Sequence, residues 1–144
     1  MNFTLTSKHL TPDRKGQSMS YDTKSILETA ISEEIKASRF YSNLALQMEE
    51  KGARLKFDDM AAVEMNHYEL LFSYYQKKYQ QRPAVQETGE LKIVRPETPS
   101  KTASFADAIK VIMDTEFRAY EFYKKAAALA TEREEQEMFA MLAR

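Results

Sequence analysis

Apolar residues recur every three or four positions along most of the chain, which is the pattern of amphipathic helices. The first such stripe predicts a helix from about residue 23 to 50 and consists of Leu27, Ile31, Glu34, Ala37, Tyr41, Leu44 and Met48. The second stripe predicts a helix that ends near residue 80 and consists of Phe57, Met60, Glu64, His67, Leu71 and Tyr74. Ser25 with Glu28 forms a capping-box pattern for the first helix, and Gly52 is expected to end it.

The remaining segments complete the expected organisation. Residues 1–20 show no periodicity and are interpreted as a flexible leader. Residues 81–103 hold three of the four prolines and predict a long connection rather than a helix. Ser104 and Asp107 form a second capping-box pattern. A third apolar stripe follows them, and a fourth helix is expected to begin near Glu134.

The chain contains an internal repeat. A shift of 82 positions aligns Glu34 with Glu116, Ala37 with Ala119, and Phe40–Tyr41 with Phe122–Tyr123. The shared pattern is E-x-x-A-x-x-F-Y, followed in each half by a second helix. Two helical hairpins (23–80 and 104–144) joined by a crossover (81–103) predict an all-α four-helix bundle over residues 21–144.

Composition narrows the class of protein. A chain of 144 residues with 43% hydrophobic residues fits one domain with a core. The formal net charge of −1 gives no electrostatic support for nucleic-acid binding. No apolar run approaches the ~20 residues that span a bilayer. The absence of cysteine excludes disulfides, thiolate catalysis and Cys-ligated metal sites, and a cytoplasmic location is expected.

Three of the predicted helices carry a glutamate inside the apolar stripe, at Glu34, Glu64 and Glu116. An ionised carboxylate in a dry core is costly unless a cation or a hydrogen-bond donor compensates it. No lysine or arginine occupies the same stripes at that level. A bound metal ion is therefore the expected compensating charge.

The spacing of these residues predicts that they meet. In an antiparallel hairpin, residues at equal distances from the turn lie at one height, and the midpoint between Glu34 and the Glu64–His67 pair falls near residue 50. A glutamate and a histidine three positions apart share a helix face and can bind one ion. Carboxylate and imidazole ligands without thiolates favour iron or manganese over zinc.

These motifs resemble the rubrerythrin branch of the ferritin-like di-iron carboxylate family. The matching patterns are E34-x-x-A-x-x-F-Y, E64-x-x-H67 and E116-x-x-A-x-x-F-Y, and the resemblance covers residues 24–80 and 104–144. It implies two iron ions (manganese or a mixed pair being the alternative), bridged by Glu34 and Glu116. Terminal ligation by Glu64 and His67 is implied as well. Tyr41 and Tyr123 are candidates for orienting a ligand carboxylate.

The resemblance also implies an activity and partners. Rubrerythrins use ferrous iron to reduce hydrogen peroxide, or react with dioxygen, in a role linked to oxidative stress. Because the chain lacks cysteine, electrons are expected from a separate donor such as a rubredoxin-like protein. A homodimer is expected through an apolar stripe that the first hairpin would leave uncovered, made of Leu27, Ile31, Tyr41, Leu71 and Tyr74.

One departure and two alternatives stay open. The repeat offset places a second Glu-x-x-His two and five positions beyond Arg144, so the chain is expected to be a fragment with a truncated fourth helix. The first alternative is a ferroxidase, as an iron-storage protein or the domain of an iron exporter. The second is a metal-free helical interaction module.

Overall fold

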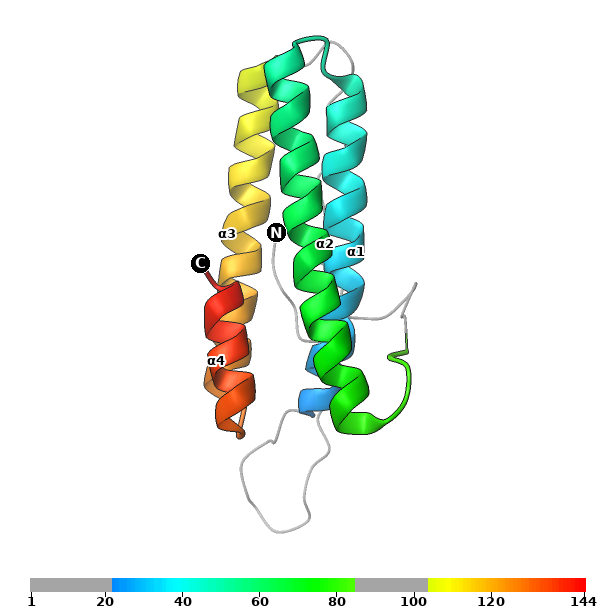
Figure 1. Ribbon diagram of the computed structural model, residues 1–144. Helices are drawn as coiled ribbons and strands as arrows, with labels where there is room; N and C mark the ends of the chain where they lie inside the picture. Colours follow the sequence, from blue (N-terminus) through cyan, green and yellow to red (C-terminus); the bar gives the residue numbers. More distant parts are fainter. Residues whose placement is uncertain (1–21, 85–103) are drawn as a thin grey trace.

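The computed structural model describes residues 22–84 and 104–144, so the predicted leader and nearly all of the predicted crossover lie outside the described residues. Four helices make up this described part: α1 (Thr23–Gln47), α2 (Lys51–Tyr79), α3 (Phe105–Leu129) and α4 (Arg133–Leu142). Figure 1 shows α1 and α2 as one antiparallel hairpin, with α3 beside it and the short α4 covering only one end of α3. The predicted all-α, ferritin-like bundle is confirmed. No helix in these ranges is long and apolar enough to cross a membrane.

The helix termini partly correct the sequence analysis. Asp22, not Ser25, caps α1: its side chain accepts a hydrogen bond from the backbone N–H of Lys24 at 3.1 Å, and the Ser25 hydroxyl donates to it. Aspartate is among the strongest N-caps, and it stands three residues before Ser25. The predicted capping box at Ser104 and Asp107 is confirmed.

The turn between α1 and α2 lies near residue 50, as the spacing of Glu34, Glu64 and His67 predicts, but Gly52 does not end α1. The last helical residue is Gln47, and Met48 is the C-cap. Glu50 caps the next helix by accepting hydrogen bonds from the backbone N–H groups of Gly52 and Ala53. Gly52 therefore belongs to the first turn of α2, where a Cβ in its place would lie 2.9 Å from Oε1 of the Glu50 cap.

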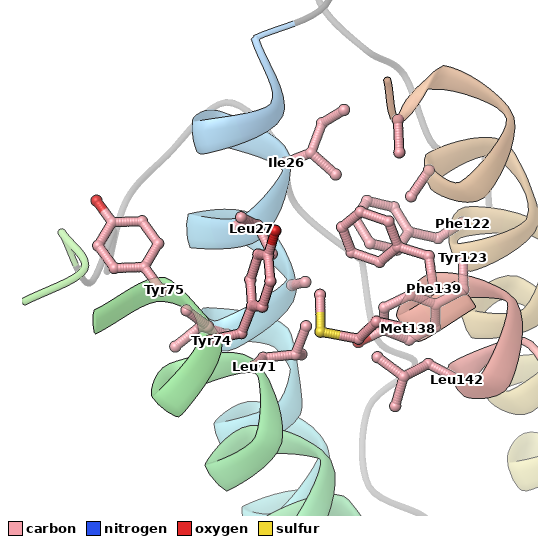
Figure 2. Close-up of a cluster of buried hydrophobic side chains, with 14 residues drawn as sticks. Ile26, Leu27, Leu71, Tyr74, Tyr75, Phe122, Tyr123, Met138, Phe139 and Leu142 are labelled. Carbon is pink, nitrogen blue, oxygen red and sulfur yellow. The ribbon is translucent and has the colours of Figure 1, made fainter. Parts of the chain in front are cut away.

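Two clusters of buried apolar side chains fill the bundle. The lower cluster joins α1, α2, α3 and α4 and includes Leu27, Ile31, Leu71, Tyr74, Phe122, Tyr123, Met138 and Phe139 (Figure 2). The upper cluster lies towards the α1–α2 turn and includes Tyr41, Leu44, Phe57, Ala61 and Ile112. On each of the three long helices, the glutamate that the sequence singles out stands between the residues of these two clusters.

The apolar stripe that was expected to stay open on the first hairpin is covered. All five of its residues are buried: Leu27, Ile31, Tyr41, Leu71 and Tyr74. Four of them pack in the lower cluster with side chains of α3 and α4 from the same chain. The second hairpin thus folds back onto the first, and this stripe cannot drive association with a second copy.

Hydrogen bonds and ion pairs connect α4 to the C-terminal end of α2. The Tyr74 hydroxyl donates to Glu135 Oε1 at 3.1 Å, and Lys78 Nζ pairs with both Glu135 and Glu132. The Glu135 side chain is only 1% exposed, and these two donors compensate its removal from water.

Candidate metal centre

The α1–α2 hairpin brings Glu34, Glu64 and His67 together. Each offers one ligand atom, and these atoms lie within 4.8 Å of one another. His67 Nδ1 lies 3.4 Å from Glu64 Oε2 and 3.7 Å from Glu34 Oε2. Glu64 and His67 are one helical turn apart on α2, and Glu34 faces them from α1. The sequence prediction that these three side chains meet is therefore matched by their geometry.

The three side chains are unevenly buried. Glu34 is 5% exposed, Glu64 is 12% exposed, and His67 is 33% exposed. Two carboxylates held this close inside a bundle repel each other when both are ionised. The imidazole can offset only one negative charge, so a cation of higher charge would stabilise the group.

The pKa values reflect this crowding. Burial and the neighbouring Glu34 carboxylate raise the pKa of Glu64 to about 7. Burial also opposes ionisation of Glu34, but hydrogen bonds with His67, Glu64 and Tyr123 outweigh it and lower the Glu34 pKa. Hydrogen bonds to Glu34 and then to Glu64 raise the pKa of His67 to about 10. Without a metal ion, protons therefore neutralise part of the charge of this group.

Glu116 stands apart from this group of three and is exposed, so the expectation of a core carboxylate is wrong at this position. It lies on α3, and its Oε1 accepts a hydrogen bond from the Tyr41 hydroxyl on α1. Reciprocally, the Tyr123 hydroxyl on α3 donates to Glu34 Oε1 on α1. Because the 82-residue repeat relates Tyr41 to Tyr123 and Glu34 to Glu116, the two hydrogen bonds are equivalent across the bundle.

A pocket between α1 and α3 links the two carboxylates. Its walls contain four repeat-related pairs, Glu33 with Thr115, Glu34 with Glu116, Ala37 with Ala119 and Tyr41 with Tyr123, together with Glu64 and Phe122. The sequence analysis did not predict Glu33 or Thr115 as site residues, and it named Phe122 only as part of the repeat. The repeat could have identified Glu33 and Thr115, because they occupy equivalent positions directly before Glu34 and Glu116.

The donor set fits a divalent transition metal. Two carboxylates and one imidazole, with no cysteine in the sequence, suit iron or manganese better than a soft thiolate-seeking ion. Tyr123 can orient the Glu34 carboxylate, which is the kind of support that ligand carboxylates receive in metal sites. Within the described ranges, these three residues form the one group of this kind.

Comparisons with known proteins agree with the arrangement. A solved structure of a hypothetical protein from Pyrococcus furiosus is similar, with 27% sequence identity and a TM-score of 0.67, over 85% of this chain and 79% of the other. A search of curated proteins gave no significant match. The Rubrerythrin family model matches residues 25–144, which is most of the chain. The chain therefore belongs to the rubrerythrin family.

Proposed function

We propose that this protein is a non-haem di-iron oxidoreductase that reduces hydrogen peroxide, or reacts with dioxygen. The observation that carries the proposal is the group of Glu34, Glu64 and His67, in which both carboxylates are buried and the imidazole is partly exposed. Glu116 lines the same pocket from α3 and can complete a second set of ligands. The chain's membership of the rubrerythrin family, whose members typically bind iron, supports iron as the metal.

Each residue has a distinct proposed role. Glu34 and Glu116 would bridge two iron ions, and Glu64 and His67 would be terminal ligands. When bound, two ferrous ions would supply the two electrons that, with two protons, convert one hydrogen peroxide into two waters. The Tyr123 and Tyr41 hydroxyls hold the Glu34 and Glu116 carboxylates in place from the opposite hairpin.

The protons held in the site make metal binding depend on pH. His67 must lose its added proton to bind a metal, and its raised pKa of about 10 makes that loss costly. Glu64, with a pKa of about 7, must also be ionised. Iron binding is therefore expected to release protons and to tighten as the pH rises through neutrality.

We also propose the partners of this reaction. Since the sequence contains no cysteine, the electrons that restore ferrous iron would come from a separate donor, such as a rubredoxin-like protein. Two copies of the chain are proposed to associate when iron is present. The alternative function, a ferroxidase, would give a different product. It would accumulate ferric mineral, whereas the proposed enzyme would consume peroxide together with a reductant.

Loading with ferrous iron tests the proposal. After anaerobic Fe(II) loading and removal of free metal, the wild type is expected to retain two iron ions per site. Glu34→Ala and Glu116→Ala are each expected to lose the pair, because each would remove a bridging ligand. Glu69→Ala, on the exposed face of α2, is the matched control and should retain the iron. Unchanged stoichiometry in both bridging variants would reject the di-iron site.

A further inference from the structure

The buried tyrosines of the described ranges all donate their hydroxyl protons to glutamates. The four pairs are Tyr41–Glu116, Tyr74–Glu135, Tyr75–Glu28 and Tyr123–Glu34. A phenol that loses an electron becomes strongly acidic, so a carboxylate that can take the hydroxyl proton makes the oxidation easier. Because the sequence contains neither tryptophan nor cysteine, tyrosine is the side chain of this protein that loses a single electron most readily.

Tyr74 differs from the other three tyrosines in its hydrogen-bond partner and in its position. Two of the others donate to Glu34 and Glu116, which are proposed metal ligands, and a ligand carboxylate must stay deprotonated. Tyr75 lies on the side of α2 that is turned away from α4 (Figure 2). Tyr74 faces α4 and donates at 3.1 Å to Glu135, which has no proposed role in metal binding.

The side chains around the Tyr74 hydroxyl can take up its proton. Lys78 Nζ pairs with Glu132 at 2.8 Å and also with Glu135, so two carboxylates share one ammonium group. If Glu135 gains a proton, Lys78 stays paired with Glu132, and no unpaired charge is left at this end of α4. Oε2 of Glu135 is buried and has no hydrogen-bond partner among the residues that the structure describes, so hydrogen bonds do not saturate this carboxylate.

Packed side chains connect Tyr74 to the metal centre. Tyr123 donates to Glu34, and its ring stacks on Phe139 with the ring centroids 6.2 Å apart. Phe139 belongs to the same buried cluster as Tyr74, and Met138 reaches from α4 towards Tyr74 (Figure 2). An electron can cross such a dry, packed cluster without movement of any side chain.

We propose that Tyr74 is a redox-active residue that supplies one electron for peroxide reduction at the metal centre, with Glu135 as the acceptor of its proton. This inference rests on the proposed function, because the oxidant is hydrogen peroxide. One hydrogen peroxide takes up two electrons and two protons to form two waters.

The electrons and protons of this step balance. Where a single ferrous ion is bound, the second electron comes from Tyr74, and both protons that form water come from the solvent. The O–H bond of the Tyr74 phenol breaks, and an O–H bond forms on the Glu135 carboxylate. The separate one-electron donor proposed above later returns an electron to Tyr74, and Glu135 returns the proton.

The first test needs no metal. In the metal-free protein, photogenerated tris(bipyridine)ruthenium(III) is expected to produce a tyrosyl radical that is long-lived, because a buried ring cannot couple with other radicals, and that EPR detects after freezing. Tyr74→Phe should lose this signal, and Tyr120→Phe, which removes an exposed hydroxyl on α3, should retain it. Formation of the wild-type signal should be slower in deuterium oxide, since an O–H bond breaks. An equally long-lived radical in Tyr74→Phe, or an unchanged rate in deuterium oxide, would overturn the inference.

A second variant separates the role of Glu135 from packing. Glu135→Gln keeps an oxygen that can accept the hydrogen bond from Tyr74 but cannot take up the proton. It should lose the long-lived radical while its circular dichroism stays that of the wild type. Glu134→Gln, at an exposed position of α4, is the control and should retain the radical. A radical in Glu135→Gln as long-lived as in the wild type would overturn the inference, even if Tyr74→Phe fails to fold.

The last experiment uses protein loaded with one ferrous ion per chain. Addition of an equimolar amount of hydrogen peroxide is expected to give the same radical in the wild type and not in Tyr74→Phe, while both bind the same amount of iron. A wild type that consumes peroxide without forming the radical would overturn the inference. A wild type that binds iron but does not consume peroxide would instead reject the proposed function.

Discussion

At the scale of single residues, the raised pKa of Glu64 predicts how the stability of the metal-free protein depends on pH. Its pKa is raised from 4.5 to about 7, chiefly by burial and the neighbouring Glu34. Folding therefore takes up a proton between those pH values, and the free energy of unfolding falls as pH rises through that window. Glu64→Gln removes this loss, so its melting temperature without metal should exceed that of the wild type by a few degrees at pH 8 and match it near pH 4.5.

Bound metal is expected to reverse the order of the two melting temperatures, because the glutamine amide is a poorer metal ligand than the glutamate carboxylate. With Fe(II) present, Glu64→Gln should melt below the wild type, which is stabilised by binding. Thermal unfolding at both pH values, with and without Fe(II), checks both parts, and Glu69→Gln on the exposed face of α2 is the control. A metal-free Glu64→Gln that is less stable at pH 8 would indicate that Glu64 serves as a structural hydrogen-bonding group.

The phenol that supports Glu34 gives a second prediction. Tyr123→Phe removes the hydrogen bond to the Glu34 carboxylate and preserves the ring, which packs beside Phe122 and Phe139 (Figure 2). Groups that orient a ligand typically contribute about 10–100-fold to metal affinity, so Fe(II) should bind at least ~10-fold more weakly. Competition with a chelator measures this, and Tyr120→Phe on the exposed side of α3 is the control. Equal affinities would mean that Tyr123 acts only in packing.

Much of the candidate site could be predicted at this scale. Glu34, Glu64 and His67 stand at helical spacings on either side of a turn, and such local relations are readable from one sequence. The hydrogen bonds from Tyr41 and Tyr123 cross between hairpins that are far apart in the sequence. The repeat makes these tyrosines equivalent but does not specify the register between α1 and α3. For the same reason, the sequence did not predict that Glu116 lies outside the group of three while it lines the same pocket.

At the scale of elements, the contact between α2 and α4 depends on Glu135. Its side chain is 1% exposed, and it accepts hydrogen bonds from Tyr74 and Lys78. Glu135→Ala leaves both donors without this acceptor. Because Lys78 retains 24% exposure, the expected loss of unfolding free energy is about 2–3 kcal/mol, below the ~3–5 kcal/mol of a fully buried pair.

Hydrogen exchange can locate this loss. In Glu135→Ala, amide protection should fall more in α4 than in the α1–α2 hairpin, because α4 is short and is fastened at this point. Glu134→Ala, which removes an exposed side chain paired with Lys77 at 3.5 Å, should change little. A uniform loss of protection over all helices would show that α4 does not open on its own.

The helices themselves were predicted closely, and the errors concern their ends. Periodicity identifies the four helical segments because each buries one face. Ser25 and Gly52 were assigned to helix ends from residue type alone, although Asp22 and Glu50 lie nearby and cap the helices more strongly. Capping depends on the backbone conformation at single positions. Where one stretch contains several residues that could cap a helix, the sequence alone does not show which of them does so.

At the scale of the whole molecule, the second hairpin changes where a partner could bind. The stripe expected to form a dimer contact is buried within the chain. Exposed large apolar side chains instead lie on one side of α3, at Met113, Phe117 and Tyr120, whose spacing of four and three places them on one helix face. Phe117 is 61% exposed, so a second copy could bury it. An iron-dependent dimer therefore remains a proposal that rests on a different surface.

Sedimentation tests this dimer. The 144-residue sequence carries one Glu-x-x-His motif, and two copies would supply two, so iron that is bound by the dimer would favour association by mass action. The average mass is expected to rise towards that of a dimer when Fe(II) is added anaerobically. His67→Ala should abolish the rise by removing a ligand, and Phe117→Asp should abolish it by charging the α3 face. Leu46→Asp, at an exposed position near the end of α1, is the control and should associate as the wild type does. A mass that is indifferent to iron would reject the dimer and leave a site built within one chain.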